Sequence, residues 1–131
     1  MKTLSILFIL TITCAFAQRN PQIRTCNITQ GVFTVYNIPG DKIGHCIYED
    51  ASIDTISLMQ KVYYDQKTIA VDEFLNGQTK CRGTIIEAKN ELRSLSICSY
   101  ADGSNILLSS LQDGVNSRVN AKMFYALDSK F

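Results

Sequence analysis

The segment CRGTIIEAKNELRSLSIC, residues 81–98, has a cysteine at each end and decides between two fold classes. Its apolar residues recur at helical spacing, residues 84–87 match a helix capping box, and its middle is rich in good helix formers. The same residues also fit a tight β-hairpin that is closed by a disulfide between the two cysteines. The hairpin implies an all-β protein, whereas a helix at about 84–97 implies an α+β protein.

The geometry of the two cysteines favours the hairpin. If Lys89 and Asn90 form a two-residue turn, Cys81 and Cys98 face each other at a non-hydrogen-bonded pair, where Cα atoms lie about 4.5 Å apart. A disulfide spans that distance, whereas a helix over the same residues would hold the cysteines about 25 Å apart. We therefore predict the hairpin, although neither of its faces is wholly apolar in this register.

The first residues have the features of a secretory signal peptide. Lys2 precedes a short apolar run, and Ala15 and Ala17 match the A-x-A pattern that signal peptidase accepts. The run is too short to span a bilayer, and no later stretch is long and apolar enough to anchor the chain. We therefore predict a signal peptide over residues 1–17 and one secreted, extracellular domain over residues 18–131, with no transmembrane anchor.

Four cysteines remain in the predicted domain: Cys26, Cys46, Cys81 and Cys98. An even number in an oxidising compartment predicts two disulfides. We expect Cys26 to pair with Cys46 once the hairpin joins the other two. The alternative pairings bond Cys46 to Cys81 or to Cys98, and either would leave residues 84–97 free to form a helix.

The rest of the chain has the rhythm of an antiparallel β protein. Turn residues recur about every 8 to 13 residues, and the runs between them are rich in Val, Ile, Thr and Tyr. These runs are 32–36, 42–48, 53–64 and 68–74. We predict an all-β fold, either a small disulfide-linked sandwich or an up-and-down barrel. The chain starts with a polar, extended stretch at 19–22. Two stretches depart from the β pattern because their apolar residues have helical spacing, namely the segment 81–98 described above and the group at 108–119.

The charge balance argues against nucleic acid as a partner. Without Lys2, 12 basic residues face 12 acidic residues. The longest basic cluster is only the pair Lys80 and Arg82, so the positive stripe of a nucleic-acid-binding protein is absent from the sequence. A zinc site is also not expected, because there is no C-x-x-C motif and only one histidine.

The residues needed for common catalytic sites are scarce. His45 is the only histidine, and it adjoins a cysteine that we expect to be oxidised, so we interpret it as a structural or surface strand residue. The carboxylate pairs Glu49-Asp50 and Asp72-Glu73 are adjacent, which would point them to opposite faces of a strand. We interpret them as turn and strand-end residues. We therefore predict no enzyme activity, no catalytic residues and no cofactor or metal.

One short motif is consistent with export. Asn27, Ile28 and Thr29 form an N-x-T sequon, which predicts a glycan on Asn27 in a protein that passes through a glycosylating secretory pathway.

Two functions remain open at this stage. The first is binding of another extracellular macromolecule, or a structural role outside the cell, through surface recognition. The second is transport of a small apolar ligand inside the barrel or sandwich. The tyrosines suit contact surfaces because they combine apolar area with a hydroxyl, although we expect most of them to pack in strands. They are Tyr36, Tyr48, Tyr63, Tyr64, Tyr100 and Tyr125.

Overall fold

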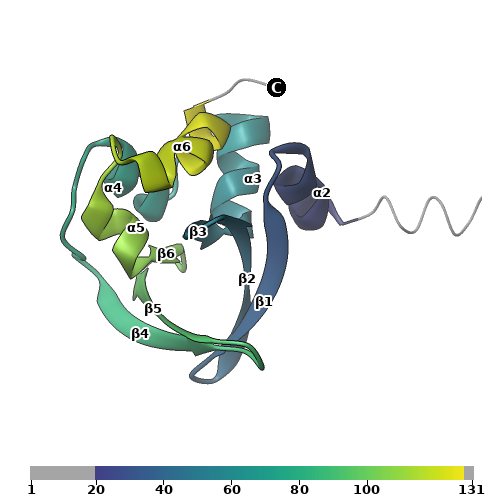
Figure 1. Ribbon diagram of the computed structural model, residues 1–131, viewed down its shortest axis with the longest axis vertical. Helices are drawn as coiled ribbons and strands as arrows, with labels where there is room; N and C mark the ends of the chain where they lie inside the picture. Colours follow the sequence, from purple (N-terminus) through teal and green to yellow (C-terminus); the bar gives the residue numbers. More distant parts are fainter. Residues whose placement is uncertain (1–19, 129–131) are drawn as a thin grey trace, which may run out of the picture.

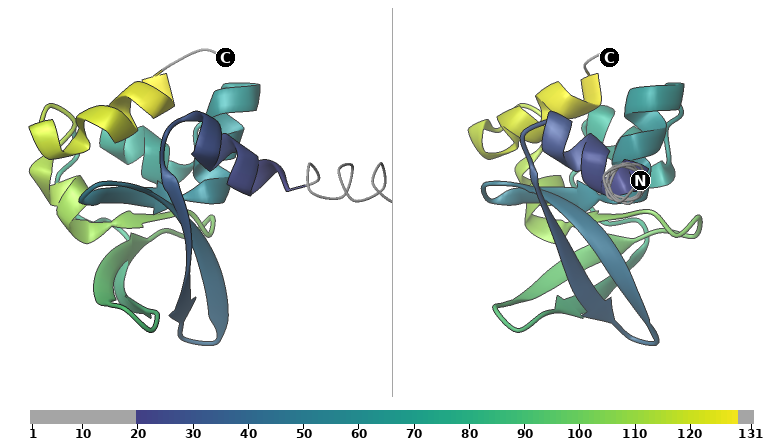
Figure 2. Two further views of the ribbon diagram at one scale, coloured as in Figure 1. Left: turned by 45° about the vertical axis from the view of Figure 1, so that its right-hand side comes forward. Right: turned by 90° about the vertical axis from the view of Figure 1, so that its right-hand side faces the viewer.

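The computed structural model describes residues 20–128, and the predicted signal peptide at residues 1–17 lies outside this range. Six strands form a closed antiparallel barrel, and helices gather over one side of it (Figure 1, Figure 2). The protein is therefore α+β. A closed antiparallel barrel, one of the two predicted architectures, is present, but the all-β prediction is wrong.

The elements follow one another with short connections. The strands are β1 (Val32–Ile38), β2 (Asp41–Tyr48), β3 (Ala51–Asp54), β4 (Thr84–Lys89), β5 (Ser94–Ser99) and β6 (Asn105–Leu107). The helices of the described part are α2 (Pro21–Ile28), α3 (Thr55–Tyr64), α4 (Ile69–Leu75), α5 (Leu108–Asp113), the 3₁₀ helix η1 (Arg118–Asn120) and α6 (Ala121–Asp128).

The strand order around the barrel is β1-β2-β3-β6-β5-β4. β3 pairs with β6 rather than with the next strand of the chain, because α3 and α4 separate β3 from β4. The barrel closes through one residue pair, Asn37 with Lys89. This order differs from the predicted up-and-down barrel, in which each strand would pair with the next.

The turns of the first three strands lie where the sequence predicts them. Pro39 and Gly40 join β1 to β2, and Gly40 has a positive φ of 79°, which glycine adopts without steric cost. Glu49 and Asp50 join β2 to β3, again as a two-residue turn. These tight turns fix the register of both pairs.

The segment 84–97 forms the predicted hairpin, so the alternative helix is wrong. Its register differs from the predicted one, because Lys89 pairs with Ser94 and the turn is made by residues 90–93. This register places Ile86 opposite Ile97 and Ala88 opposite Leu95, so one face of the hairpin is apolar except for the pair Thr84 and Ser99 at its open end. That face packs inside the barrel, which is why this register is more stable than the shorter turn.

Both disulfide pairings agree with the prediction. Cys26 bonds to Cys46 and Cys81 bonds to Cys98, with Cα separations of 5.5 and 5.7 Å. The reason differs for the second bond, since Cys98 lies opposite Ile85 in the ladder. Cys81 reaches Cys98 from the bend before β4, where Gly83 lies so close to β5 that a Cβ would fall 2.1 Å from the carbonyl oxygen of Ser99.

Two predicted strands are helices. Most of 53–64 belongs to α3, which begins because the Asp54 side chain accepts a hydrogen bond from the backbone N–H of Ser57. Most of 68–74 belongs to α4, whose first N–H groups donate to the side chains of Asp102 and Ser104. These caps satisfy the first N–H groups of α3 and α4 and start both helices, although the β-rich composition of these segments favours strands.

The two ends of the described part also differ in part from the prediction. Residues 20–22 form the N-cap and first turn of α2 rather than an extended segment, since Asn20 caps the helix and Pro21 occupies its first turn. The helical spacing at 108–119 is confirmed in part by α5, which ends at Gly114. α6 was not predicted, and it supplies Met123 and Leu127 to the core.

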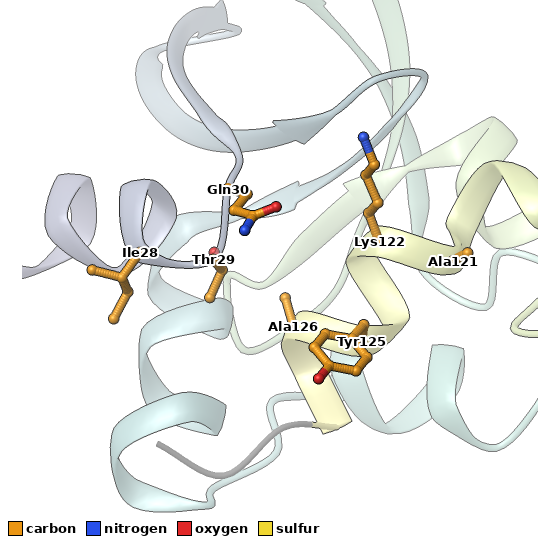
Figure 3. Close-up of a pocket in the computed structure, with 7 residues that line it drawn as sticks. All are labelled: Ile28, Thr29, Gln30, Ala121, Lys122, Tyr125 and Ala126. Atoms are coloured by element: carbon orange, nitrogen blue, oxygen red, sulfur yellow. The ribbon is translucent and has the colours of Figure 1, made fainter.

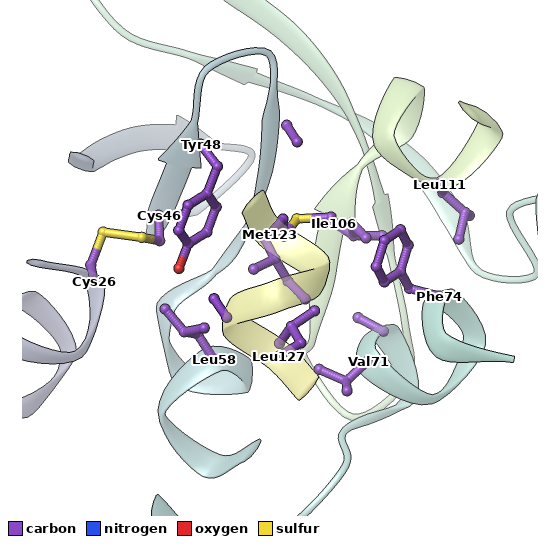
Figure 4. Close-up of a cluster of buried hydrophobic side chains, with 14 of the residues drawn as sticks. Cys26, Cys46, Tyr48, Leu58, Val71, Phe74, Ile106, Leu111, Met123 and Leu127 are labelled. Carbon is purple, nitrogen blue, oxygen red and sulfur yellow. A yellow bond between two sulfur atoms is a disulfide. The ribbon is translucent and has the colours of Figure 1, made fainter. Parts of the chain in front are cut away.

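Two apolar clusters hold the fold together. The larger lies between the helices and the strand face that carries Cys46, Ile53 and Ile106, and it includes Leu58 of α3 and Leu127 of α6 (Figure 4). The smaller lies on the opposite strand face, inside the barrel. Its residues are Tyr36, Ala88 and Ile97, with Ile38, Ile43, Ile47, Ile86 and Leu95 partly buried against them.

Candidate functional site

A buried polar network surrounds His45 inside the barrel. The Nδ1 atom of His45 lies 2.9 Å from the Ser52 hydroxyl, and Nε2 is hydrogen-bonded to Oδ1 of Asn105. The imidazole also meets the ring of Tyr36 edge to face, with centroids 5.9 Å apart. His45 is therefore a buried structural residue of β2, and its polar partners come from β3 and β6.

The hydrogen bonds determine the tautomer of His45. Asn105 donates through Nδ2 to the carbonyl of Gly103, so its Oδ1 accepts and Nε2 of His45 must carry the proton. Nδ1 then accepts from the Ser52 hydroxyl. Burial lowers the pKa of His45 to about 4, although the hydrogen bond with Asn105 opposes this shift, and the ring is neutral at neutral pH.

Ser52, His45 and Asn105 resemble the hydroxyl, imidazole and orienting group of a hydrolytic relay. Sequence inspection did not find this arrangement, because its members lie up to 60 positions apart and no local motif joins them. All three residues are buried, and in the described part of the chain none lines the groove between α2 and α6, the pocket beside α4, β4 and β5, or the pocket beside α3. The network therefore presents no hydroxyl to a substrate at those surfaces.

A second buried network lies around Asp54. Its carboxylate accepts hydrogen bonds from the Ser57 N–H and hydroxyl and from the Asn105 N–H, and Ser57 also bonds to Thr68. Burial raises the pKa of Asp54, while these hydrogen bonds oppose the shift. The group joins β3, β6, α3 and the start of α4, and its geometry is that of a helix cap.

An apolar groove lies between the end of α2 and α6, as Figure 3 shows. Ile28 and Thr29 border it on one side, and Tyr125 and Ala126 border it on the other. Its volume is about 340 Å³. An ion pair between Lys122 and Glu49, with Nζ and Oε1 2.6 Å apart, supplies a polar group beside this apolar surface.

The tyrosines divide evenly between the interior and the surface. Tyr36, Tyr48 and Tyr100 are buried, whereas Tyr63, Tyr64 and Tyr125 are exposed. All three exposed rings belong to α3 or α6, and α3 packs against both α2 and α6. Tyr125 therefore lines the groove, whereas Tyr63 and Tyr64 lie on α3, which packs against both helices that frame it.

The barrel interior holds a further feature that the sequence did not reveal. The hydroxyl of Tyr36 is buried and has no hydrogen-bond partner in the described structure. Five aliphatic side chains that pack against the cluster of Tyr36, Ala88 and Ile97 are only partly buried. Burial of an unpaired hydroxyl costs roughly 1 to 3 kcal/mol, so the Tyr36 hydroxyl lowers the free energy of unfolding of the free protein.

The other predicted residues occupy separate places. Asn27 is exposed near the end of α2, so the folded chain leaves room for a glycan there. Glu49 and Asp50 form the β2–β3 turn as predicted, but Asp72 and Glu73 lie within α4 rather than at a strand end. Among residues 20–128, no group of three His, Cys, Asp or Glu side chains is arranged to hold a metal ion.

No protein-family model matches this chain, and no curated protein or solved structure is significantly similar to it. Within the described residues, the helices are too short or too polar to cross a membrane.

The buried His45 predicts a loss of stability in mild acid. An unfolded histidine takes up a proton near pH 6.5, whereas the folded one resists until about pH 4, so stability falls as the pH falls through this window. Between pH 7 and pH 5 we expect His45 to contribute a loss of about 2 kcal/mol in the free energy of unfolding. Urea unfolding at both pH values measures it.

The comparison protein is the His45→Gln variant, which lacks the titrating ring. Asp54 acts in the opposite sense, because its raised folded pKa makes stability fall as the pH rises, but it is present in both proteins and cancels. Equal pH dependence in the wild type and the variant would show that His45 is not buried in its neutral form.

Proposed function

We propose that this protein is exported and acts without catalysis, by binding another extracellular macromolecule through the face formed by α2, α3 and α6. The observation that carries the proposal is the apolar groove between α2 and α6, together with the exposed tyrosines on α3 and α6. Tyrosine provides a large rigid contact area and a hydroxyl at low entropic cost, and is enriched in binding surfaces.

The groove has the composition of a small contact site. Its floor is apolar, Tyr125 is 74% exposed beside it, and Ile28 is 44% exposed across from it. The ion pair of Lys122 with Glu49 supplies polar atoms near the apolar centre, as protein interfaces commonly do. We infer that the groove accepts one apolar side chain of the partner while the neighbouring tyrosines cover the surrounding surface.

The proposal predicts that binding depends on the groove. Once a partner has been isolated and purified, Tyr125→Ala and Ile28→Ala should each weaken its binding about tenfold or more, because each removes apolar contact area at the centre of the interface. The measurement is the dissociation constant from calorimetry or biolayer interferometry. Leu92→Ala is the matched control, since Leu92 is 88% exposed on the β4–β5 turn and lies outside the groove.

Two results would contradict the proposal. The first is binding that is unaffected by both groove variants but reduced by Leu92→Ala. The second is turnover of an ester, amide or glycoside substrate by the purified protein that disappears in the His45→Ala variant.

Export and glycosylation at Asn27 form the next prediction. Expression of the full chain in a eukaryotic secreting host should release into the medium a protein that begins at Gln18 and carries an N-glycan. Amidase treatment should lower its mass and convert Asn27 to aspartate. The Thr29→Ala variant removes the sequon and should migrate at the lower mass without treatment. Retention of the chain in the cell, or equal mobility of both proteins, would reject this prediction.

A second candidate function is carriage of a small apolar ligand inside the barrel. It is favoured by the unpaired hydroxyl of Tyr36 amid partly buried aliphatic side chains. A fatty acid would offer an acceptor for that hydroxyl and an apolar chain for the surrounding isoleucines.

The carrier function predicts a one-to-one complex with a fatty acid such as laurate. Native mass spectrometry should show the added mass, and Tyr36→Phe should weaken binding several-fold because it removes the only proposed hydrogen-bond donor. Tyr63→Phe is the control, because it deletes a hydroxyl on the exposed face of α3. An unshifted mass at millimolar laurate would eliminate the carrier function.

A further inference from the structure

A pocket of about 460 Å³ lies between α4 and the strands β4 and β5. It is distinct from the groove of α2 and α6 and shares no residue with it. Its walls combine charged, hydroxyl and apolar groups. The side chains lining the pocket include Ile69, Glu73, Arg82, Thr84, Ile86 and Tyr100.

Two opposite charges lie side by side in this pocket. The Glu73 side chain is only 18% exposed, and one of its carboxylate oxygens lies 3.8 Å from Nε of Arg82. This separation is too long for a hydrogen bond. Within the described part of the chain, neither side chain has another hydrogen-bond or ion-pair partner. A mostly buried carboxylate normally has closer donors, so this ion pair has hydrogen-bonding capacity to spare.

A third polar group lies close to the pair. Tyr100 is 7% exposed, and its hydroxyl has no hydrogen-bond partner in the described part of the chain. Burial raises the pKa of Tyr100, Glu73 raises it further, and Arg82 lowers it, so the hydroxyl is protonated at neutral pH and feels both charges. Tyr100 lines the pocket, and its unpaired hydroxyl is buried near the Glu73 and Arg82 charges, so a ligand reaches this donor only if the ring turns toward the pocket.

The backbone around these groups is well constrained. Arg82 follows Cys81 directly, and the disulfide to Cys98 ties this segment to β5. α4 carries Glu73, and its first N–H groups are held by the side chains of Asp102 and Ser104. The backbone segments that carry Arg82 and Glu73 are thus held in place before any ligand arrives, whereas the Arg82 side chain is 67% exposed and becomes ordered only on binding.

We propose that this pocket binds a small apolar zwitterion, specifically a free α-amino acid with an aliphatic side chain. Its carboxylate would pair with Arg82 and accept from Tyr100, and its ammonium group would donate to Glu73. Its side chain would lie against Ile69 and Ile86. A simple anion would be repelled by Glu73 and a simple cation by Arg82, whereas a zwitterion satisfies both.

The test measures binding of L-leucine to the full mature protein by calorimetry or ligand-observed NMR. Leucine should bind with a dissociation constant of about 1 mM or tighter. N-acetyl-leucine, which is only an anion, and leucinamide, which is only a cation, should bind at least tenfold more weakly. Phosphocholine also carries a negative and a positive group but is a lipid headgroup rather than an amino acid. If it bound as tightly as leucine, the assignment to an amino acid would be overturned.

Three variants locate the site. Glu73→Gln and Arg82→Gln should each weaken leucine binding about tenfold or more, because each removes one charge partner. Tyr100→Phe should weaken binding several-fold but leave the unfolding midpoint unchanged or higher, because the deleted hydroxyl is unpaired in the free protein.

Glu87→Gln is the matched control. It disrupts an exposed ion pair with Lys89 on the same strand β4, outside the pocket, and should leave leucine binding unchanged. The proposal is overturned if leucine shows no binding at several millimolar. It is also overturned if the acetylated or amidated forms bind as tightly as leucine, or if the pocket variants bind like the wild type.

Discussion

The carboxylate of Asp54 is the interaction on which the arrangement of strands and helices depends. It lies at the last residue of β3 and accepts two hydrogen bonds from Ser57 at the start of α3. It also accepts the backbone N–H of Asn105, the first residue of β6. One buried group thus ends a strand, begins a helix and joins β3 to β6. Replacement by an apolar residue would leave these donors unpaired in a buried site, which is costly.

The same junction explains where inference from the sequence failed. The run 53–64 is rich in β-branched and aromatic residues, which favours a strand. The helix forms because Asp54 caps it and because Leu58 and Val62 reach the larger cluster. An N-cap aspartate before Thr55 was the available signal. For α4 no local signal was sufficient, since its caps come from residues more than 30 positions away.

Features set by local chemistry were predictable, and features set by distant packing were not. The turns at Pro39-Gly40 and Glu49-Asp50 follow from the conformations of their own residues. The existence of the hairpin at 84–97 followed from the two cysteines, but its register depends on which side chains face the barrel interior. Likewise, the composition indicated a lone histidine, yet its partners Ser52 and Asn105 become visible only once β2, β3 and β6 are neighbours.

The two disulfides connect the fold to the proposed binding sites. Ile28, at the edge of the groove, follows Cys26 by two residues, and Arg82 follows Cys81 by one. Cys26 lies in a short helix and Cys81 lies in a bend before β4, so neither segment is held by a strand ladder. A covalent bond from each to a strand restricts the segment before a ligand binds, and this saves ordering entropy at the moment of association. The disulfides therefore stabilise the small domain and also pre-organise the surfaces on which its proposed functions rest.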